Sequence, residues 1–325
     1  MTPQFKIIAN QTDITLIIQQ RLISIRITDE SGIKGDTLDI QLDDEPPIEW
    51  PHHGAELEVL IGFNKTTHNA GLVRQGLYIV DEIAHSGPPN TFTLRGKASN
   101  LKQSLKQPKT RSWNDITLGN LVNIIALEHG ISAKVGEPLK DQAMPHVDQT
   151  DESDLHLLTR LARDVGAMVK PVAGYLVMVP RGEAKSVTGQ SLPLIMITAD
   201  QIKQHHVTQT EARQYDAVIT YWHNTQTAKR EVVEVGEGRV FMSRHTYADE
   251  TTARSAAKAK LNQFKRSLLQ LSLTLIGNPN LMAEGKINVT GLRDPINGSW
   301  VIERVVHQIN DQGFTSGIDA VPPKD

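Results

Sequence analysis

Acidic side chains crowd one short segment of the sequence, where acid–base chemistry would be sought first. Asp148, Asp151, Glu152 and Asp154 stand together directly before an apolar helical pattern. A glycoside hydrolase needs two carboxylates that face each other across a cleft, one of them with a raised pKa. Carboxylates in the first turn of a helix are explained more simply, because they interact favourably with the positive end of the helix dipole. We therefore interpret this cluster as a helix start and predict no catalytic residue in it.

Histidines form two adjacent pairs, His52–His53 and His205–His206. Neighbouring residues of a strand point to opposite faces, so one metal ion would rarely bind both members of such a pair. The motifs HExxH, GxSxG, GxxxxGK[ST] and a GxGxxG after a strand are absent. The chain also has no cysteine, which excludes thiol catalysis and thiolate metal sites. The sequence thus predicts no catalytic residue, no cofactor and no metal site.

A polar stretch at residues 101–115 carries recurring basic side chains. These are Lys102, Lys106, Lys109 and Arg111. A nucleic-acid-binding patch would usually interleave several aromatic residues with the basic ones, but only Trp113 is nearby. We interpret the stretch as a solvated linker or extended arm.

Composition limits the class of protein. The 325 residues predict two or three domains, and a hydrophobic fraction of 39% argues against wholesale disorder. The net charge of −3 argues against a dedicated nucleic-acid binder. Counted from the sequence, residues 1–100 carry a net −5 and residues 201–325 a net +2. The N-terminus lacks the pattern of a signal peptide, and we expect folding in a reducing cytoplasm.

The elements predicted from periodicity give a mainly β chain with an α+β insertion. Alternating apolar residues over 12–99 predict five or more short strands, as in a sandwich or barrel. A middle region, residues 101–204, contains two predicted helices and then a hairpin that turns at Ala173–Gly174. Residues 205–325 return to strands, apart from one helix at about 249–268 with Asp249 as its N-cap.

Both helices of the middle region carry clear end signals. The first follows Thr117 as a plausible N-cap and ends at Gly130, which fits the position just after a helix. The second begins in the acidic cluster and ends at Gly166. Its buried stripe is predicted at Leu155, Leu158, Leu161 and Val165.

An internal repeat links the two ends of the chain. Without a gap, the segment from Gly76 to Ala98 can be laid on the segment from Gly298 to Ala320. The shared landmarks are Gly76 with Gly298, His85 with His307, and Phe92 with Phe314. Two β-hairpins could look alike through alternation alone, but alternation does not require these landmarks. We favour a duplication in which the first and last thirds are copies of one β domain, and we expect both histidines to serve packing or a backbone hydrogen bond.

The arrangement resembles the phage late control gene D proteins, which are tail hub proteins of contractile-tailed phages. It is similar also to the N-terminal hub region of the type VI secretion VgrG proteins. The segments that carry the resemblance span most of the chain, in family order: residues 24–44, 53–63, 76–99, 111–135, 149–180, 245–261 and 273–307.

The resemblance implies a non-enzymatic structural protein at the tail tip of a virion, assembled in the host cytoplasm. It implies tube-like β-barrel domains at residues 1–100 and 205–325 that flank the middle module at 101–204. The implied form is a homotrimer that joins a sixfold tail tube, or a tube-initiator protein, to a threefold central spike. VgrG-type chains continue into a spike, so here the spike is expected to be a separate polypeptide.

Further partners implied by the resemblance are a tape-measure protein and the baseplate wedge. Two alternatives stay open, a tail-associated cell-wall hydrolase and a receptor- or glycan-binding tail module. A hydrolase would need a cleft with paired carboxylates. A glycan-binding module would need exposed aromatic platforms, although the chain has only 4 Trp, 5 Tyr and 6 Phe.

Overall fold

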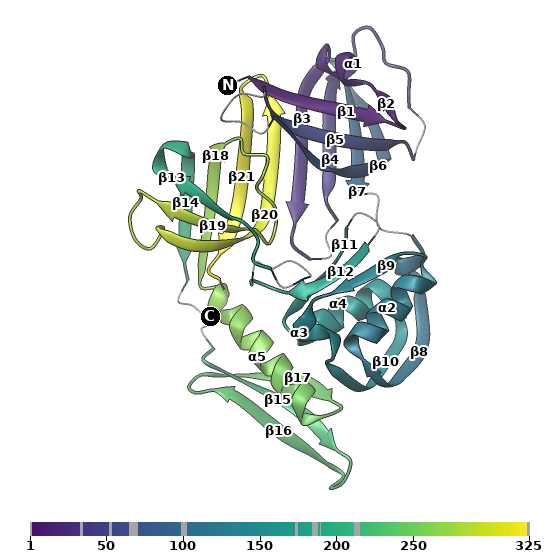
Figure 1. Ribbon diagram of the computed structural model, residues 1–325, viewed down its shortest axis with the longest axis vertical. Helices are drawn as coiled ribbons and strands as arrows, with labels where there is room; N and C mark the ends of the chain where they lie inside the picture. The colour runs from purple at the N-terminus through teal and green to yellow at the C-terminus, as the bar shows by residue number, and fades with distance from the viewer. Residues whose placement is uncertain are drawn as a thin grey trace.

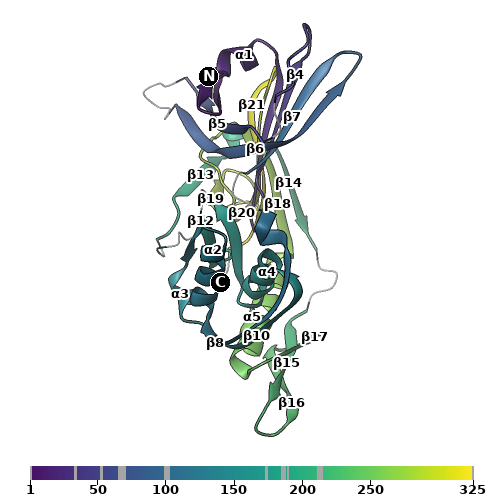
Figure 2. The same ribbon diagram turned by 90° about the vertical axis from the view of Figure 1, so that its right-hand side faces the viewer.

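The computed structural model shows an elongated molecule with β units at one end and a small sheet with a long helix at the other (Figures 1 and 2). The helix-containing middle module lies beside them. The structure describes residues 2–32, 35–51, 54–64, 71–98, 103–172, 175–183, 188, 190–210 and 215–323.

The first β unit supplies seven strands to a 13-stranded sheet. They are β1 (Pro3–Ala9), β2 (Thr12–Asp13), β3 (Leu22–Glu30), β4 (Thr37–Asp43), β5 (Glu56–Phe63), β6 (Leu72–Ser86) and β7 (Thr91–Ala98), with a short helix α1 (Thr15–Gln19). Their order in the sheet is β3-β4-β7-β6-β5-β1-β2. Ile25, Ile27 and Ile40 are at most 1% exposed, which confirms the alternation that predicts strands here.

The second β unit continues the same sheet. Its strands are β13 (Leu194–Thr198), β14 (Ile202–Gln209), β18 (Leu269–Ile276), β19 (Lys286–Thr290), β20 (Gly298–Asn310) and β21 (Gly313–Val321). The C-terminal half of β20 pairs with β3, and this pairing joins the two units. The unit begins at Leu194, before the predicted boundary at residue 205, because β13 pairs with the distant strand β19. Closure of either unit into a barrel stays a prediction.

The middle module surrounds its own apolar core. It contains β8 (Pro108–Thr117), α2 (Leu118–Glu128), β9 (Ser132–Val135), α3 (Glu137–Lys140), β10 (Ala143–Ser153), α4 (Asp154–Asp164), β11 (Ala167–Val172), β12 (Tyr175–Pro180) and a 3-10 turn, Gln103–Lys106. The predicted hairpin is confirmed by β11 and β12, which pair antiparallel, while its turn at Ala173–Gly174 lies outside the described residues. Leu118, Leu121 and Leu158, which come from both helices, are fully buried in this core.

The helix ends in the middle module follow the local signals. The side chain of Thr117 accepts a hydrogen bond from the Asn120 amide, which confirms it as the N-cap of α2. Gly130 and Gly166 take positive φ angles of 60° and 68° just after α2 and α4. Such angles cost glycine no side-chain clash.

Two predictions in this module are wrong. Residues 108–117 form strand β8, not a solvated linker, because they pair along β10. Helix α4 begins at Asp154 with Ser153 as its N-cap, so Asp148, Asp151 and Glu152 lie in β10.

A separate three-stranded sheet with helix α5 occupies the far end of the molecule. Strands β15 (Ala217–Asn224), β16 (Lys229–Gly236) and β17 (Val240–Tyr247) pair only with each other among the described strands. Helix α5 (Glu250–Arg266) packs its buried residues Ala253, Ala257 and Leu261 against this sheet. Asp249 accepts a hydrogen bond from the Thr252 amide at 2.9 Å and so caps α5 as predicted. The sequence pattern predicts that these strands belong to the second β unit, whereas in the structure they form a sheet of their own.

Candidate functional site

The repeated hairpins share one irregularity at matching positions. In the β6–β7 hairpin a bulge falls at Asp81, between the pairs Val80–Gly96 and Glu82–Arg95. In the β20–β21 hairpin a bulge falls at Glu303, the residue that the sequence alignment matches with Asp81. A bulge bends a strand and increases its twist. A shared bulge supports the duplication, which stays a proposal.

Residues that the sequence repeat matches do not have matching cross-strand partners in the two hairpins. His85 stands opposite Phe92, but His307 stands opposite Ser316 and not opposite Phe314. The cause is the turn, which joins Ser86 to Thr91 in one hairpin and Asn310 to Gly313 in the other. A shift of two residues preserves the face of a strand. Phe92 and Phe314 are accordingly both buried, in the same core.

Of the landmark glycines, Gly298 begins β20, whereas Gly76 lies inside β6. At Gly76 a Cβ atom would come within 3.3 Å of the Tyr78 ring.

The two landmark histidines have different surroundings. The His307 ring is buried, with Nδ1 at 2.9 Å from the Ser316 hydroxyl and Nε2 at 3.2 Å from the Leu281 carbonyl oxygen. Burial lowers the pKa of His307 to about 4, so the ring is neutral at physiological pH. His85 is half-exposed, and its Nε2 lies 3.2 Å from the buried carboxylate of Asp44. The packing role predicted for both fits His307, and His85 instead contacts a carboxylate.

A row of polar side chains crosses five neighbouring strands of the large sheet, and opposite charges face each other on four of them. This polar row is formed by residues that stand directly opposite one another from β20 to β6, namely Gln308, Arg26, Asp39, Arg95 and Glu82. Arg26 donates to Gln308 at 3.2 Å, and Arg95 pairs with Asp39 at 3.1 Å and with Glu82 at 2.5 Å. Cross-strand pairs of this kind contribute roughly 0.2–1 kcal/mol each. Within this row, the charges of Arg26 and Arg95 balance those of Asp39 and Glu82.

A buried ion cluster lies at the centre of the middle module. The Asp154 carboxylate is fully buried, and Lys109 (2.6 Å), Arg111 (2.7 Å), Gln149 (2.8 Å) and His129 (2.8 Å) all contact it. Burial opposes ionisation of the carboxyl, but hydrogen bonds from Lys109, Gln149 and His129 outweigh it and hold the pKa of Asp154 at about 2. The carboxylate therefore stays charged and links β8, β10 and the end of α2 to the start of α4.

The sequence alone predicts that Asp154 interacts only with the helix dipole and that Lys109 and Arg111 are exposed to solvent. The signal that could have corrected this was the alternation of Lys109, Arg111 and Trp113, which places all three on one face of a strand. Arg111 also lies over the Trp113 ring, 4.4 Å from its centroid.

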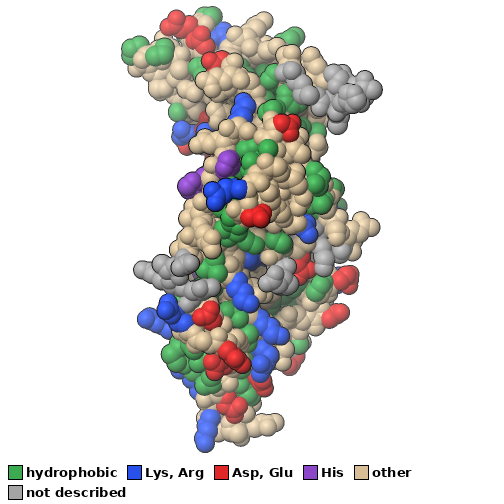
Figure 3. Space-filling model, turned by 90° about the vertical axis from the view of Figure 1, so that its left-hand side faces the viewer, with side chains coloured by type: hydrophobic (Ala, Val, Ile, Leu, Met, Phe, Trp, Pro, Cys, Tyr) green, Lys and Arg blue, Asp and Glu red, His purple; other side chains and the backbone are tan. Residues whose placement is uncertain are grey.

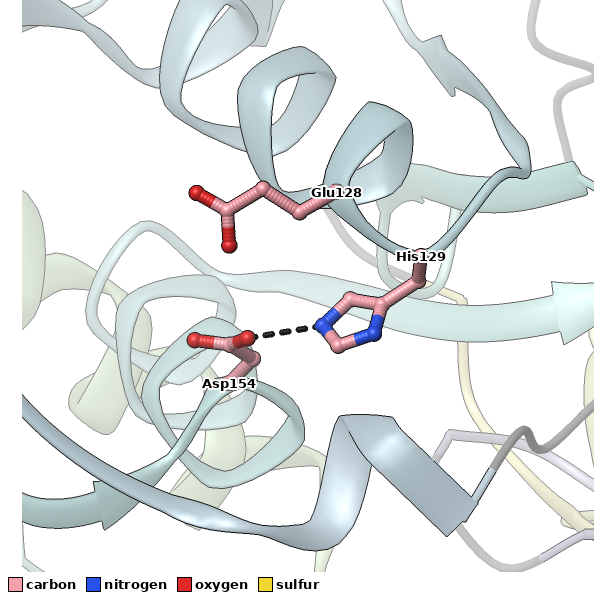
Figure 4. Close-up of side chains that lie close together, drawn as sticks. All are labelled: Glu128, His129 and Asp154. Carbon is pink, nitrogen blue, oxygen red and sulfur yellow. Dashed lines mark hydrogen bonds and ion pairs between the residues drawn. The ribbon is translucent and has the colours of Figure 1, made fainter.

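Glu128, His129 and Asp154 are close enough to be considered as metal ligands (Figure 4), with candidate ligand atoms within 4.8 Å of one another. Lys109 contacts both carboxylates, at 2.9 Å for Glu128 and 2.6 Å for Asp154. Arg111 contacts the same two at 2.6 and 2.7 Å. Two protein cations thus hold the position that a metal ion would take, so the residues present do not fit a metal site.

The same cluster contains a serine–histidine–aspartate chain. Ser104 Oγ lies 2.7 Å from His129 Nδ1, and His129 Nε2 lies 2.8 Å from Asp154. In a serine hydrolase the serine meets substrate in an open cleft, and the carboxylate serves the histidine. Here His129 is only 6% exposed, and Asp154 is shared with two cations. We interpret the chain as one that holds Ser104 against α2 and α4.

A second ion cluster joins the middle module to both β units. The Lys170 ammonium, from β11, donates to Asp29 at 2.6 Å, to Asp36 at 2.6 Å and to the Glu30 carbonyl oxygen at 3.0 Å. The other oxygen of Asp29 accepts a hydrogen bond from the Ala283 amide, in the loop before β19. The Asp29 carboxylate of the first β unit thus contacts both the middle module and the second β unit.

The charge on Asp36 makes this junction sensitive to pH. Burial, and then the neighbouring Asp29 carboxylate, raise the pKa of Asp36 to about 7, although Lys170 opposes the rise. Because the folded pKa lies above the unfolded value, the folded state binds the proton more tightly. This contribution to stability is full below about pH 4 and is lost as the pH rises through about 7.

We therefore expect the melting temperature to fall between about pH 4 and about pH 7 and to level off above that, as measured by calorimetry. An Asp36→Asn variant should lose most of this fall, while Asp39→Asn, a partly exposed control in the adjoining strand β4, should keep it. A fall of equal size in the Asp36→Asn variant would contradict the assignment.

The remaining predicted residues are scattered. His205 and His206 stand opposite Leu273 and Ser272, on different faces of β14. His52, His53 and Lys102 lie outside the described residues. Lys106 ends the 3-10 turn, away from the acidic cluster in sequence.

Comparison with known proteins decides the family. The family model described as phage tail baseplate hub (GPD) matches residues 66–313. A probable baseplate hub protein of Escherichia phage 186 is 30% identical, and the alignment covers 98% of this chain and 92% of the relative. The chain belongs to the phage tail baseplate hub family. As a member of this family, it is a structural component of the virion tail baseplate.

Solved structures share the hub fold at low sequence identity. The 43 kDa tail protein of prophage MuSo2 from Shewanella oneidensis has a TM-score of 0.71 at 15% identity, with 98% of each chain covered. An Escherichia coli component of the type VI secretion system has a TM-score of 0.57 at 12% identity, covering 94% of this chain and 74% of that one. The likeness to a type VI component agrees with the resemblance drawn from the sequence. Within the described part of the hub, no helix is long and apolar enough to cross a membrane.

Proposed function

We propose that three copies of this hub form a ring that joins a sixfold tail tube to a threefold central spike. The observation that carries the proposal is the pair of β units within one chain. They lie side by side in one sheet, and each contains a hairpin with a bulge at the matching position. A cyclic trimer then presents six such units, alternating between first and second copies around the axis.

The polar row supports a channel through this ring. It crosses from the second β unit to the first without an apolar residue in the row. Its charges neutralise each other through the pairs Arg95–Asp39 and Arg95–Glu82. A balanced wall would give a passing DNA strand no basic patch to bind. On the face drawn in Figure 3, basic and acidic side chains are likewise interspersed, and neither sign gathers into a large area.

Some of the opposite charges at the two ends of the chain pair with each other within one subunit. Arg304 on β20 lies 3.4 Å from Glu30 on β3, where the two β units pair. The contacts between subunits therefore depend mainly on other groups. We expect apolar burial and strand-edge pairing to supply most of that stability.

Native mass spectrometry of the hub mixed with its candidate tube and spike proteins tests the proposal. We expect complexes with three hub chains and three spike chains, and with six tube chains added when the tube protein is present. Tape-measure and wedge proteins are further partners to add in the same way. A hub dimer bound to the spike would contradict the proposal.

A cell-wall hydrolase is the alternative that the sequence leaves open, and such an activity would have to depend on the buried chain of Ser104, His129 and Asp154. Incubation with purified peptidoglycan distinguishes the two functions. We expect no release of soluble fragments. Release that disappears in a Ser104→Ala variant would favour the hydrolase instead.

A further inference from the structure

Three arginines line a small pocket where the middle module meets helix α5 and the loop after β3. The pocket has a volume of about 200 Å³. Arg163 comes from the last turn of α4, Arg181 follows β12, and Arg266 ends α5. Ser31 and Gln263 also line the pocket and supply polar groups.

Two of these arginines form no direct ion pair in the described part of the chain. Arg181 is paired, since its Nη2 lies 3.2 Å from Glu303 and 3.3 Å from the Ser31 hydroxyl. In the described part of the chain, neither Arg163 nor Arg266 has a carboxylate within ion-pair distance. The Nε atom of Arg266 is buried and has no hydrogen-bond partner there. A buried donor without a partner is rare in native proteins, and a bound anion is one arrangement that would satisfy it.

The described residues that line the pocket include three arginines and no acidic residue. Burial, and then the neighbouring Arg181, lower the pKa of Arg266. Burial and Arg163 lower the pKa of Lys260 in the same way. The carboxylates of Glu284 and Glu303 act on the Arg266 pKa in the opposite direction. Glu284 accepts a hydrogen bond from the Gly182 amide at 3.1 Å and lies 4.0 Å from Arg181. Burial raises the pKa of Glu284, so it is a weak counter-ion.

We propose that this pocket binds a phosphate group. Guanidinium groups bind phosphate through paired N–H donors, and three of them arriving from three elements suit a tetrahedral anion better than a planar carboxylate. The volume is smaller than the roughly 300–1,000 Å³ of sites for drug-sized ligands, so the pocket takes one phosphate group and not a whole nucleotide. Such an anion would bridge the middle module, α5 and the loop after β3.

Titration of the full chain with inorganic phosphate tests the proposal, with ionic strength held constant by sodium chloride. Ligand binding to the folded state alone raises its stability, and we expect the melting temperature to rise by about 2–4 °C at roughly ten times the dissociation constant. Sulfate should act similarly, and acetate should not. A short DNA duplex that displaces phosphate would identify the backbone as the source of the group, whereas no displacement would identify the free anion.

Variants separate this site from general salt effects. Arg266→Gln should weaken phosphate binding at least about tenfold, and Arg163→Gln, which changes a more exposed side chain, should weaken it without risk to folding. Arg254→Gln is the matched control, because Arg254 lies exposed on α5 and pairs with Glu250 at 2.6 Å. The proposal would be overturned if the wild type bound no phosphate, if acetate bound as well as phosphate, or if Arg163→Gln and Arg266→Gln both bound phosphate like the control.

Discussion

An Asp154→Asn variant of the hub is expected to lose about 3 kcal/mol of stability in its middle module. The substitution keeps the shape of the side chain but removes the charge that Lys109 and Arg111 both contact. Breaking a buried ion pair costs about 3–5 kcal/mol, and we expect the low end because both cations reach solvent and keep Glu128 as a partner. Hydrogen exchange of the amides in α2 and α4 measures the loss.

Asp148→Asn is the matched control for that variant. Asp148 lies on the neighbouring strand, but its side chain is 67% exposed and contacts only His146, at 3.1 Å, among the ion pairs described. We expect a change of less than about 1 kcal/mol there. Equal losses in the two variants would show that the buried cluster does not hold the module together.

A Lys170→Met variant is expected to loosen the middle module from the β units, at a cost of about 3 kcal/mol near pH 8. Methionine keeps most of the length of the side chain, but it leaves Asp29 and Asp36 side by side without their cation. The loss should shrink towards about pH 6, because one of the two carboxyls can then take up a proton. Limited proteolysis and hydrogen exchange of β3 and β11 at both pH values measure the effect.

Lys97→Met is the control for the junction. Lys97 is exposed and pairs with Asp81 at 2.5 Å on the large sheet, so its loss should cost less than about 1 kcal/mol at either pH. A junction that opens equally in both variants, or a Lys170→Met effect without any dependence on pH, would argue against the role given to Lys170.

The elements predicted best are those whose signals are local. Helix α2 could be located because Thr117 caps it and Gly130 follows it, and α5 because Asp249 caps it. These contacts join residues a few positions apart, so the order of side chains along the chain contains the information. The alternation around Gly76 and around Gly298 is a local signal too, and it predicts a β-hairpin near each end of the chain.

The elements that escaped prediction depend on distant partners. Strand β8 looked like a linker because its pairing strand β10 lies beyond α2 and α3 in the chain. Strand β13 is held by β19, and the Lys170 contact with Asp29 joins residues 141 positions apart. The junction could not be found from sequence spacing, because it depends on how separate modules pack. Of the Asp154 cluster, spacing indicates only that Lys109 and Arg111 share one face of a strand.

Image reconstruction of assembled baseplates without imposed symmetry would show directly how many hub chains form the ring. We expect three copies of this chain per ring, with first and second β units alternating around the axis and the polar row facing the channel. A ring of two or six copies, or a ring in which only one β unit of each chain reaches the axis, would contradict the proposal.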